Sequence, residues 1–171
     1  MRYIPLRDGG FAMVDGEDYP KLIIYEWFER KGKYSSYALA KVTPEMKEKF
    51  RFLRFRRWRS KQPIGMPYLI IGTKPGHIID HKDHNGLNNQ KLNIRHATNR
   101  QNSANQRKLQ REFPFKGVYP SPTKGKYRAF CDHVYLGLFS DPVLAARAYD
   151  VEAMKKFGEF ALLNFEKGGE K

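Results

Sequence analysis

The sequence predicts an α+β protein built from short strands and a few helices, and three observations support this fold class. Residues 1–44 consist of short aromatic and β-branched runs separated by turn residues. Residues 77–109 follow the order strand, loop, strand, helix, and residues 117–156 follow the order of three strands and one helix. A basic stretch that ends at Pro114 separates the two patterns. We therefore expect a β-rich region over 1–60, a core over 61–110 and a C-terminal module over 115–166.

The N-terminal region is expected to contain a β-hairpin followed by a basic strip. Aromatic and β-branched residues predict one strand over 21–29, a turn over 31–33 and a second strand over 34–40. Thr43 before Pro44 is typical of a helix start. Residues 51–61 interleave arginines with aromatic residues, as in a surface helix with a solvated face or in a strip that lies along phosphates. The candidate DNA-binding residues of this strip are Arg54, Arg56, Arg57 and Arg59.

The central region is expected to carry short strands around a polar loop. Strands are predicted over 68–71 and 77–80, with a turn between them, and again over 93–97. Thr98 and Gln101 have the spacing of a capping box, so a helix is expected to begin there and to run to about residue 109.

The C-terminal module is expected to be a three-stranded sheet with one helix on its back. Strands are predicted over 117–119, 126–131 and 134–139. The second and third strands are joined by a tight turn at Asp132-His133, and a helix is predicted from Pro142 to Lys156. The spacing of apolar residues predicts that one face of this helix consists of Leu144, Ala148, Val151 and Met154.

The bulk charge of the chain indicates the kind of partner. A net charge of +14 and an isoelectric point of about 9.9 favour a polyanion. Nucleic acid is preferred to a membrane, because the sequence has no run of about 18 apolar residues and its first residues lack the apolar core of a signal peptide. The single cysteine, Cys131, excludes an internal disulfide and a multi-cysteine zinc site, and it fits a reducing compartment.

Four polar residues around the central loop have the chemistry that phosphodiester hydrolysis needs. Asp80 offers a hard anionic oxygen suited to magnesium, and His81 can accept a proton near neutral pH. Their side chains diverge, because neighbouring residues of a strand point to opposite faces. Asn102 could add a neutral oxygen ligand from the helix, and Asn93 could hydrogen-bond across the loop and fix the histidine. A divalent cation beside a histidine can support water activation and stabilise the charge on phosphorus and on the leaving oxygen.

Other interpretations of these residues stay open at this point. An Asp-His pair by itself is common, and the asparagines over 85–89 are typical of turns. His81, His84 and His96 could instead bind zinc, although the site is hydrophilic and cysteine ligands are lacking. His77 and His133 are expected to be structural or to contact phosphates.

The central stretch resembles the HNH nuclease motif over residues 78–98, whose sequence is IIDHKDHNGLNNQKLNIRHAT. It is most similar to the HNH homing endonucleases of phages and mobile introns. The resemblance implies a ββα-metal fold in which Asp80 and Asn102 are ligands of Mg²⁺ or Mn²⁺. It also implies that His81 is the general base and that Asn93 orders the loop.

The chain departs from the pattern of this family at a few positions. Asn88 stands where aspartate is frequent, and Ile94 where leucine is frequent. Pro67 and Tyr68 stand where many members carry histidine and arginine. The last departure bears on substrate contacts at that place and leaves the metal site unaffected.

The C-terminal module resembles the AP2 DNA-binding domain over residues 115–165, in particular through the runs YLGLF, AARAYD and LLNF. The resemblance implies that a three-stranded sheet enters the DNA major groove with the helix behind it. Alternation along the second strand agrees, because Arg128 and Phe130 share one face while Ala129 and Cys131 face the helix. Phe130 replaces a frequent glutamate, so the target sequence of plant members is not carried over. Outside the strip, the candidate DNA-binding residues are Arg95, Lys116, Tyr119, Ser121, Lys124, Lys126, Arg128, Phe130 and Tyr135, whereas Tyr149, Asp150 and Asn164 are expected to be structural.

Together these observations predict a site-specific, metal-dependent endonuclease of the homing type that hydrolyses phosphodiester bonds in double-stranded DNA. The main alternative is a noncatalytic DNA-binding regulator with a structural HNH remnant, and an RNA-binding protein is a third class. We expect a monomer, with a dimer not excluded, that acts in the cytoplasm of a bacterial or phage-infected cell in association with the nucleoid.

Overall fold

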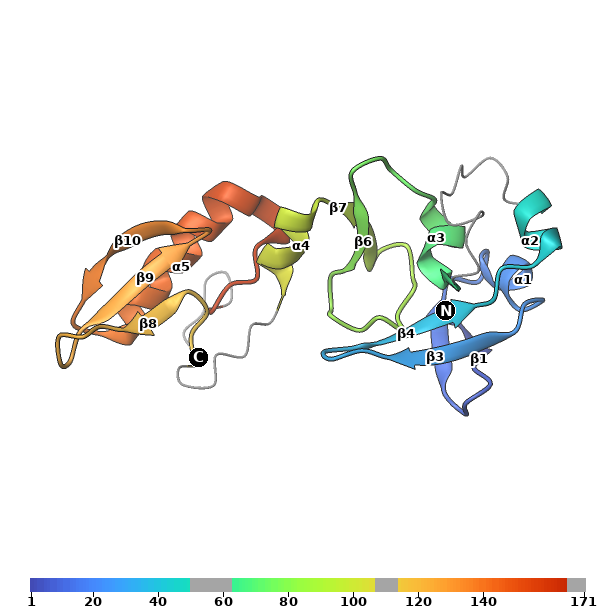
Figure 1. Ribbon diagram of the computed structural model, residues 1–171, viewed down its shortest axis with the longest axis horizontal. Coiled ribbons are helices and arrows are strands. Elements are labelled where there is room, and N and C mark those ends of the chain that lie inside the picture. The colour runs from blue at the N-terminus through green and yellow to red at the C-terminus, as the bar shows by residue number, and fades with distance from the viewer. Residues whose placement is uncertain (50–62, 107–113, 166–171) are drawn as a thin grey trace. The chain divides into compact units, whose positions relative to one another are not determined.

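A computed structural model describes residues 1–49, 63–106 and 114–165 of the chain. The chain divides into two compact units, Met1–Asn99 and Arg100–Lys171 (Figure 1). Several small sheets and a few helices make up the two units, which confirms the predicted α+β class. The basic strip predicted over 51–61 lies outside the described residues.

The first unit begins with two strands and a short helix. Strand β1 (Arg2–Pro5) pairs antiparallel with β2 (Phe11–Val14), and α1 (Tyr19–Leu22) follows. A strand was expected to start at residue 21, and this expectation is wrong, because Leu22 is fully buried at the end of α1. The indole Nε1 of Trp27 donates to the carbonyl of Leu22 at 2.8 Å, which ties the helix to the strand after it.

The predicted hairpin forms two strands of a three-stranded sheet of order β3-β4-β5. Strand β3 (Trp27–Lys31) pairs antiparallel with β4 (Ser36–Ala40), and β4 also pairs with the short β5 (Ile64–Gly65). Helix α2 (Pro44–Lys49) begins where the Thr-Pro pair predicts it. The Thr43 hydroxyl accepts a hydrogen bond from the backbone N–H of Met46 at 3.1 Å, as in an N-cap.

A short helix occupies the place of a predicted strand. Residues 68–71 belong to α3 (Met66–Ile71), so the strand prediction there is wrong. Four apolar residues are too few to distinguish a buried strand from a buried helix by periodicity. The buried residues Met66 and Leu69 are spaced as on one helix face, and Pro67 stands in the first turn, where a missing N–H costs nothing.

The motif region forms a two-stranded antiparallel sheet. Strand β6 (Ile78–His81) pairs with β7 (Ile94–Ala97), and the register places Asp80 opposite Arg95. Helix α4 (Asn99–Asn105) follows as the capping box predicts, although it ends at Asn105 and therefore before residue 109. The order strand, loop, strand, helix is confirmed.

One hydrophobic core joins the N-terminal strands to the motif region. Its buried side chains come from β1 and β2, from the three-stranded sheet and from α1, α2 and α3, and they include Ile4, Trp27, Met46 and Met66. Leu87, from the motif loop, packs against the same cluster. Segments predicted as 1–60 and 61–110 thus share a core, while α4 from Arg100 onward belongs to the second unit.

The second unit is a three-stranded antiparallel sheet with a helix along it (Figure 1). Its elements are β8 (Val118–Pro120), β9 (Tyr127–Cys131), β10 (Val134–Phe139), α5 (Pro142–Phe157) and the 3-10 helix η3 (Gly158–Phe160). The predicted elements are confirmed, including the tight turn, whose residues Asp132 and His133 have φ of 49° and 68°. Positive φ at both positions matches the right-handed twist of a two-residue hairpin.

The face that α5 turns to the sheet differs from the predicted one. Ala145, Ala146, Tyr149 and Ala153 are buried, whereas Leu144 and Val151 are 52% and 72% exposed. The prediction is wrong because it weighted large apolar residues, while close approach of a helix to a small sheet favours alanine. None of the described helices is long and apolar enough to cross a membrane.

Candidate active site and nucleic-acid interface

Asp80 and His81 end strand β6, and a buried ion pair holds the first of them. The Nε of Arg95, directly opposite on β7, donates to Asp80 Oδ2 at 2.9 Å. The two side chains are 11% and 5% exposed, so the pair is shielded from water. Arg95 therefore orients the carboxylate and balances its charge, and a phosphate contact by the same arginine stays a prediction.

His81 is buried, and a second asparagine contacts its ring. The Nε2 of His81 lies 3.3 Å from Asn89 Oδ1, and the ring of Tyr37 lies with its centroid 6.1 Å away. Burial lowers the pKa of His81 below its ordinary value, which the hydrogen bond of Asn89 and the charges of Asp83 and Asp80 oppose only in part. The imidazole is therefore neutral at pH 7, the state that a general base requires.

Asn93 closes the loop between β6 and β7. Its Nδ2 donates to Asp83 Oδ1 at 2.9 Å and to the carbonyl of Asn88 at 2.7 Å, while its Oδ1 accepts from the backbone N–H of Asp83 at 3.0 Å. Burial acts to raise the pKa of Asp83, yet hydrogen bonds from Asn85, Asn88 and Asn93 hold the pKa below its ordinary value. Asn93 thus hydrogen-bonds across the loop, as the sequence predicts, and Asn89 is the residue whose side chain contacts the histidine ring.

Asn89 is the residue that sequence reasoning missed, because it was interpreted as a turn former. It is fully buried, and its Nδ2 donates to the carbonyl of Leu87 at 3.3 Å, which directs Oδ1 to His81. Its backbone N–H donates to the carbonyl of Met13 at 2.8 Å, and the N–H of Met13 donates to Leu87 at 2.8 Å. The loop thus runs parallel to the edge of β2. This contact fixes the position of Asn89 in the loop, so that Asn89 is the asparagine that faces His81.

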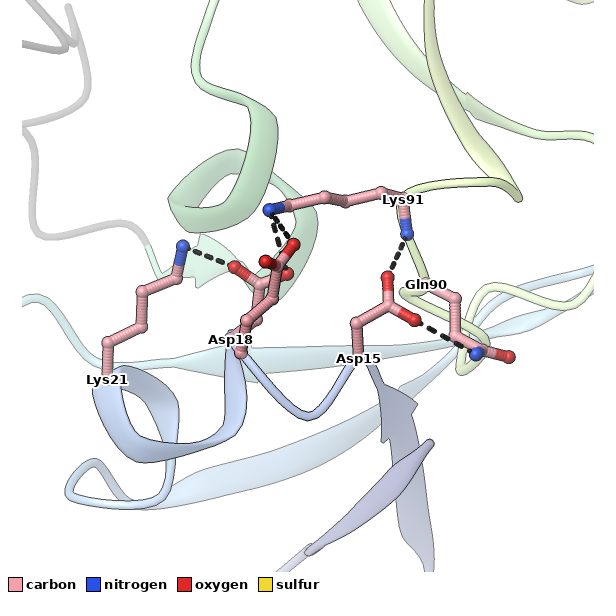
Figure 2. A network of polar contacts seen from close by, with 6 residues as sticks. Asp15, Asp18, Lys21, Gln90 and Lys91 are labelled. Carbon is pink, nitrogen blue, oxygen red and sulfur yellow. Dashed lines mark hydrogen bonds and ion pairs between the residues drawn. The ribbon is translucent and has the colours of Figure 1, made fainter.

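A polar network fastens the end of the same loop to the segment between β2 and α1 (Figure 2). The carboxylate of Asp15 accepts from the backbone N–H of Lys91 at 2.8 Å and from Gln90 Nε2 at 3.1 Å. The Nζ of Lys91 pairs with Glu17 and lies 3.5 Å from Asp18 Oδ2. The backbone hydrogen bond from Lys91 is the main cause that lowers the pKa of Asp15, so this carboxylate is ionised at neutral pH.

The β3–β4 hairpin contacts the opposite side of the loop. The backbone N–H of Gly86 donates to Ser35 Oγ at 2.8 Å. A Cβ at Gly86 would lie 2.4 Å from the carbonyl oxygen of Ser36 and 2.5 Å from the ring of Tyr37, so no larger residue fits. The loop that carries Asn89 is therefore held between two segments that precede it in the chain by more than 40 residues.

The candidate metal ligands of the site are oxygen donors. Within residues 1–49, 63–106 and 114–165, no three histidine, cysteine, aspartate or glutamate side chains are grouped to hold a metal ion. Magnesium commonly binds through one or two carboxylates together with water and substrate phosphates, which suits Asp80. Asn102 lies in α4, and its pairing with Asp80 stays a prediction.

The sheet of the second unit exposes a mixed aromatic and basic face. The ring of Phe130 lies 5.8 Å from that of Tyr119 and 5.3 Å from that of Tyr135, measured between centroids. Arg128 lies on the same face of β9 as Phe130, and its Nη2 donates to the carbonyl of Pro120 at 3.2 Å. The expected alternation is confirmed, because Ala129 and Cys131 are buried toward α5.

The remaining candidate DNA contacts of this unit differ in their surroundings. Lys124 and Lys126 are exposed and Ser121 is half-buried, near the turn between β8 and β9. Lys116, by contrast, donates through Nζ to the carbonyls of Ala104 and Gln106 at the end of α4, so its observed role is to cap that helix. DNA contacts by these residues stay predictions.

The residues expected to be structural, Tyr149, Asp150 and Asn164, connect the segment after α5 to the start of β8. Asn164 Oδ1 accepts from the backbone N–H of Lys116 at 2.6 Å, and Asp150 accepts from the backbone N–H groups of Asn164 and Phe165 at 2.8 and 3.0 Å. A Cβ at Gly117, whose φ is 77°, would lie 2.1 Å from the ring of Tyr149. The segment after α5 is thus tied to the start of β8.

Comparison with known proteins identifies the class to which this site belongs. No family model matches the chain, and no solved structure matches it. The chain is 31% identical over 163 residues to an uncharacterized HNH endonuclease, L560, of Acanthamoeba polyphaga mimivirus, an alignment that covers 91% of this chain and 75% of that protein. The chain belongs to the HNH endonuclease family.

A second relative matches only a part of the chain. The AP2-like ethylene-responsive transcription factor At1g79700 of Arabidopsis thaliana is 37% identical over 71 residues, which cover 33% of this chain and 23% of that protein. The chain therefore spans less than a quarter of the plant protein.

Proposed function

We propose that this protein is a metal-dependent, site-specific DNA endonuclease of the homing type, with a ββα-metal core around β6, β7 and α4 and an AP2-like sheet as its DNA reader. The observation that carries the proposal is the pair of buried contacts at the end of β6. Arg95 holds the carboxylate of Asp80 at 2.9 Å, and Asn89 contacts the ring of the adjacent His81 at 3.3 Å. An oriented anionic oxygen and a neutral imidazole are thereby presented from neighbouring residues.

Asp80 and Asn102 would hold Mg²⁺ or Mn²⁺ through oxygen atoms. When bound, such an ion supplies positive charge that stabilises the phosphorane-like transition state and the leaving oxygen. His81 accepts the proton of the attacking water, and its low pKa keeps it unprotonated for this task. Asn89 and Asn93 act indirectly, since Asn89 orients the ring and Asn93 holds the shape of the loop.

Duplex DNA would be held by the second unit and by the basic strip. Tyr119, Phe130 and Tyr135 form an aromatic surface bordered by Arg128 and Lys126, which suits contacts to base edges and phosphates. The overall charge of +14 supplies the nonspecific electrostatic part of the affinity. A monomer with a single copy of this site would cut one strand, and a dimer could cut both.

The alternative of a noncatalytic DNA-binding regulator is favoured by one observation. The carboxylate of Asp80 is already balanced by Arg95, and a remnant site could keep this pair for stability alone. Against it stands the burial of a neutral histidine beside the carboxylate, since burying both groups costs free energy that a purely structural site would not need.

A plasmid-nicking assay separates the two functions. The wild-type chain should nick plasmid carrying a matching site in Mg²⁺ and not in EDTA, and His81→Ala should bind the same DNA without nicking it. His77→Ala is the matched control, because His77 directly precedes β6 in the same unit and its Nδ1 lies 2.8 Å from the carbonyl oxygen of Pro75, a local contact away from His81. Nicking by His81→Ala at the wild-type rate would remove His81 from the mechanism, and absence of nicking by the wild type would favour the regulator.

A further inference from the structure

The tip of the β3–β4 hairpin is a basic and aromatic surface in the first unit. Arg30, Lys31, Lys33, Tyr34 and Tyr37 are all exposed, and the two tyrosines are 66% and 43% exposed. The Nζ of Lys33 lies 5.0 Å from the centroid of the Tyr34 ring. The sequence contains no acidic residue from Arg30 to Lys41, so the charge of the tip is positive only.

The hairpin tip lies directly beside the candidate base. The rings of Tyr37 and His81 have centroids 6.1 Å apart, and Ser35 and Ser36 contact Gly86 in the loop that carries Asn89. Arg30 lies opposite Tyr37 in the antiparallel register, so their side chains share one face of the hairpin. The hairpin tip and the loop between β6 and β7 therefore pack against each other beside His81.

We propose that the hairpin tip binds the DNA backbone immediately next to the phosphodiester bond that is cut. This inference rests on the function proposed above, because it takes His81 as the group beside the scissile phosphate. Consecutive nucleotides of one strand are about 3.4 Å apart along the duplex axis, so a ring 6.1 Å from His81 lies within reach of nucleotides about two positions from a phosphate held at His81. A strand whose phosphate reaches His81 therefore comes within reach of Tyr37.

The positive charge and the exposed tyrosines of the hairpin tip favour a nucleic-acid backbone as its binding partner. Lysine and arginine neutralise phosphates, and this contact positions the duplex without reading its sequence. Exposed tyrosines add flat contacts to sugars and bases. A partner protein would have to be strongly acidic to match the same surface, and this outcome is distinguished by the test.

The test compares two double variants of the full chain. Lys33→Ala with Tyr34→Ala removes one lysine and one tyrosine of the tip without touching the loop residues that contact the hairpin. Lys74→Ala with Tyr3→Ala removes the same side-chain types from exposed positions of the same unit, in the segment before β6 and on β1. Binding of fluorescein-labelled mixed-sequence duplex DNA is measured by anisotropy in EDTA, over a series of salt concentrations.

We expect the tip variant to bind DNA about tenfold more weakly, because it loses a charge-assisted contact to a phosphate. The slope of log K against log salt should fall by about 0.9, the value for one lost phosphate contact. The control variant should keep the wild-type affinity and slope. Equal affinities of tip variant and wild type would overturn the proposal, and a stoichiometric complex with an acidic protein instead of DNA would do the same.

A crosslinking experiment tests the position of the tip. A photo-crosslinking phenylalanine derivative at position 37 should attach to nucleotides within about two positions of the nick. Attachment only at distant nucleotides would refute the placement. Since anisotropy needs no cleavage, a failure of the nuclease proposal appears as DNA binding without nicking, whereas failure of the tip proposal appears as nicking with an unaltered affinity.

Discussion

Replacing Asn89 by leucine removes the oxygen that lies 3.3 Å from His81 Nε2, while keeping a side chain of similar volume in a fully buried position. A buried imidazole that loses this partner is less well oriented, at a cost of about 1–3 kcal/mol. If the whole cost falls on the transition state, nicking slows by about 5- to 150-fold. The backbone N–H of Asn89 still reaches Met13, so the edge contact with β2 is retained.

Single-turnover nicking, DNA affinity and the pH profile of the rate together test this prediction. Asn89 is not exposed and cannot contact DNA, so the affinity should be unchanged while the rate falls. Its hydrogen bond raises the pKa of His81, and burial has already lowered that pKa. The acidic limb of the pH–rate profile should therefore lie below the ordinary histidine value of about 6.5 in the wild type and still lower in Asn89→Leu.

The matched control is Asn85→Ala, which changes an exposed asparagine of the same loop and should alter the rate by less than about threefold. A wild-type rate and an unshifted acidic limb in Asn89→Leu would refute the reasoning. Weaker DNA binding at an unchanged rate would also contradict it, since it would assign Asn89 to the substrate surface.

Three further predictions concern the packing and charges around the two units. Arg95→Leu leaves the buried Asp80 carboxylate without its ion pair and should lower the free energy of unfolding by about 3–5 kcal/mol in thermal melts, whereas Arg95→Leu combined with Asp80→Asn should recover most of that loss. Gly86→Ala forces a Cβ against Ser36 and Tyr37 and should reduce both stability, by about 1–3 kcal/mol, and nicking; Gly16→Ala, where a Cβ meets nothing within 4 Å, should do neither. Arg100 and Lys156 lower the pKa of Asp132 from 3.8 to about 2, so the stabilisation from this carboxylate is complete above pH 3.8 and is lost as the pH falls toward 2. Circular dichroism melts should show this loss in the wild type and a smaller one in Arg100→Ala, and equal slopes would contradict the role of the pair.

Local signals account for the parts of the fold that were predicted correctly. The turn at Asp132-His133 and the helix start at Pro142 are decided by a few neighbouring residues, so the second unit could be outlined from its sequence. The divergence of Asp80 and His81 follows from strand geometry alone. The proposed chemistry therefore rests on signals that need no coordinates.

The wrong predictions share one cause, which is that burial was inferred from residue type. Tyr68-Leu69-Ile70-Ile71 has the composition of a strand, yet the packing of Met66 and Leu69 into the core makes it a helix. In α5 the sheet accepts alanines and leaves Leu144 exposed, because close approach matters more there than apolar area. The helix at Met66–Ile71 is not visible in the local sequence.

What the sequence by itself determined was the presence of an acid beside a histidine on a strand, an asparagine-rich loop after them and a basic chain around them. Only the tertiary structure decided which asparagine contacts the ring of His81. Met13 and Asp15 align the loop along β2, and the hairpin tip blocks its other side at Gly86. Contacts between residues more than 40 positions apart follow no period in the sequence. Only the folded chain could therefore distinguish Asn89, buried against His81, from the exposed Asn85 and the half-buried Asn88 of the same loop.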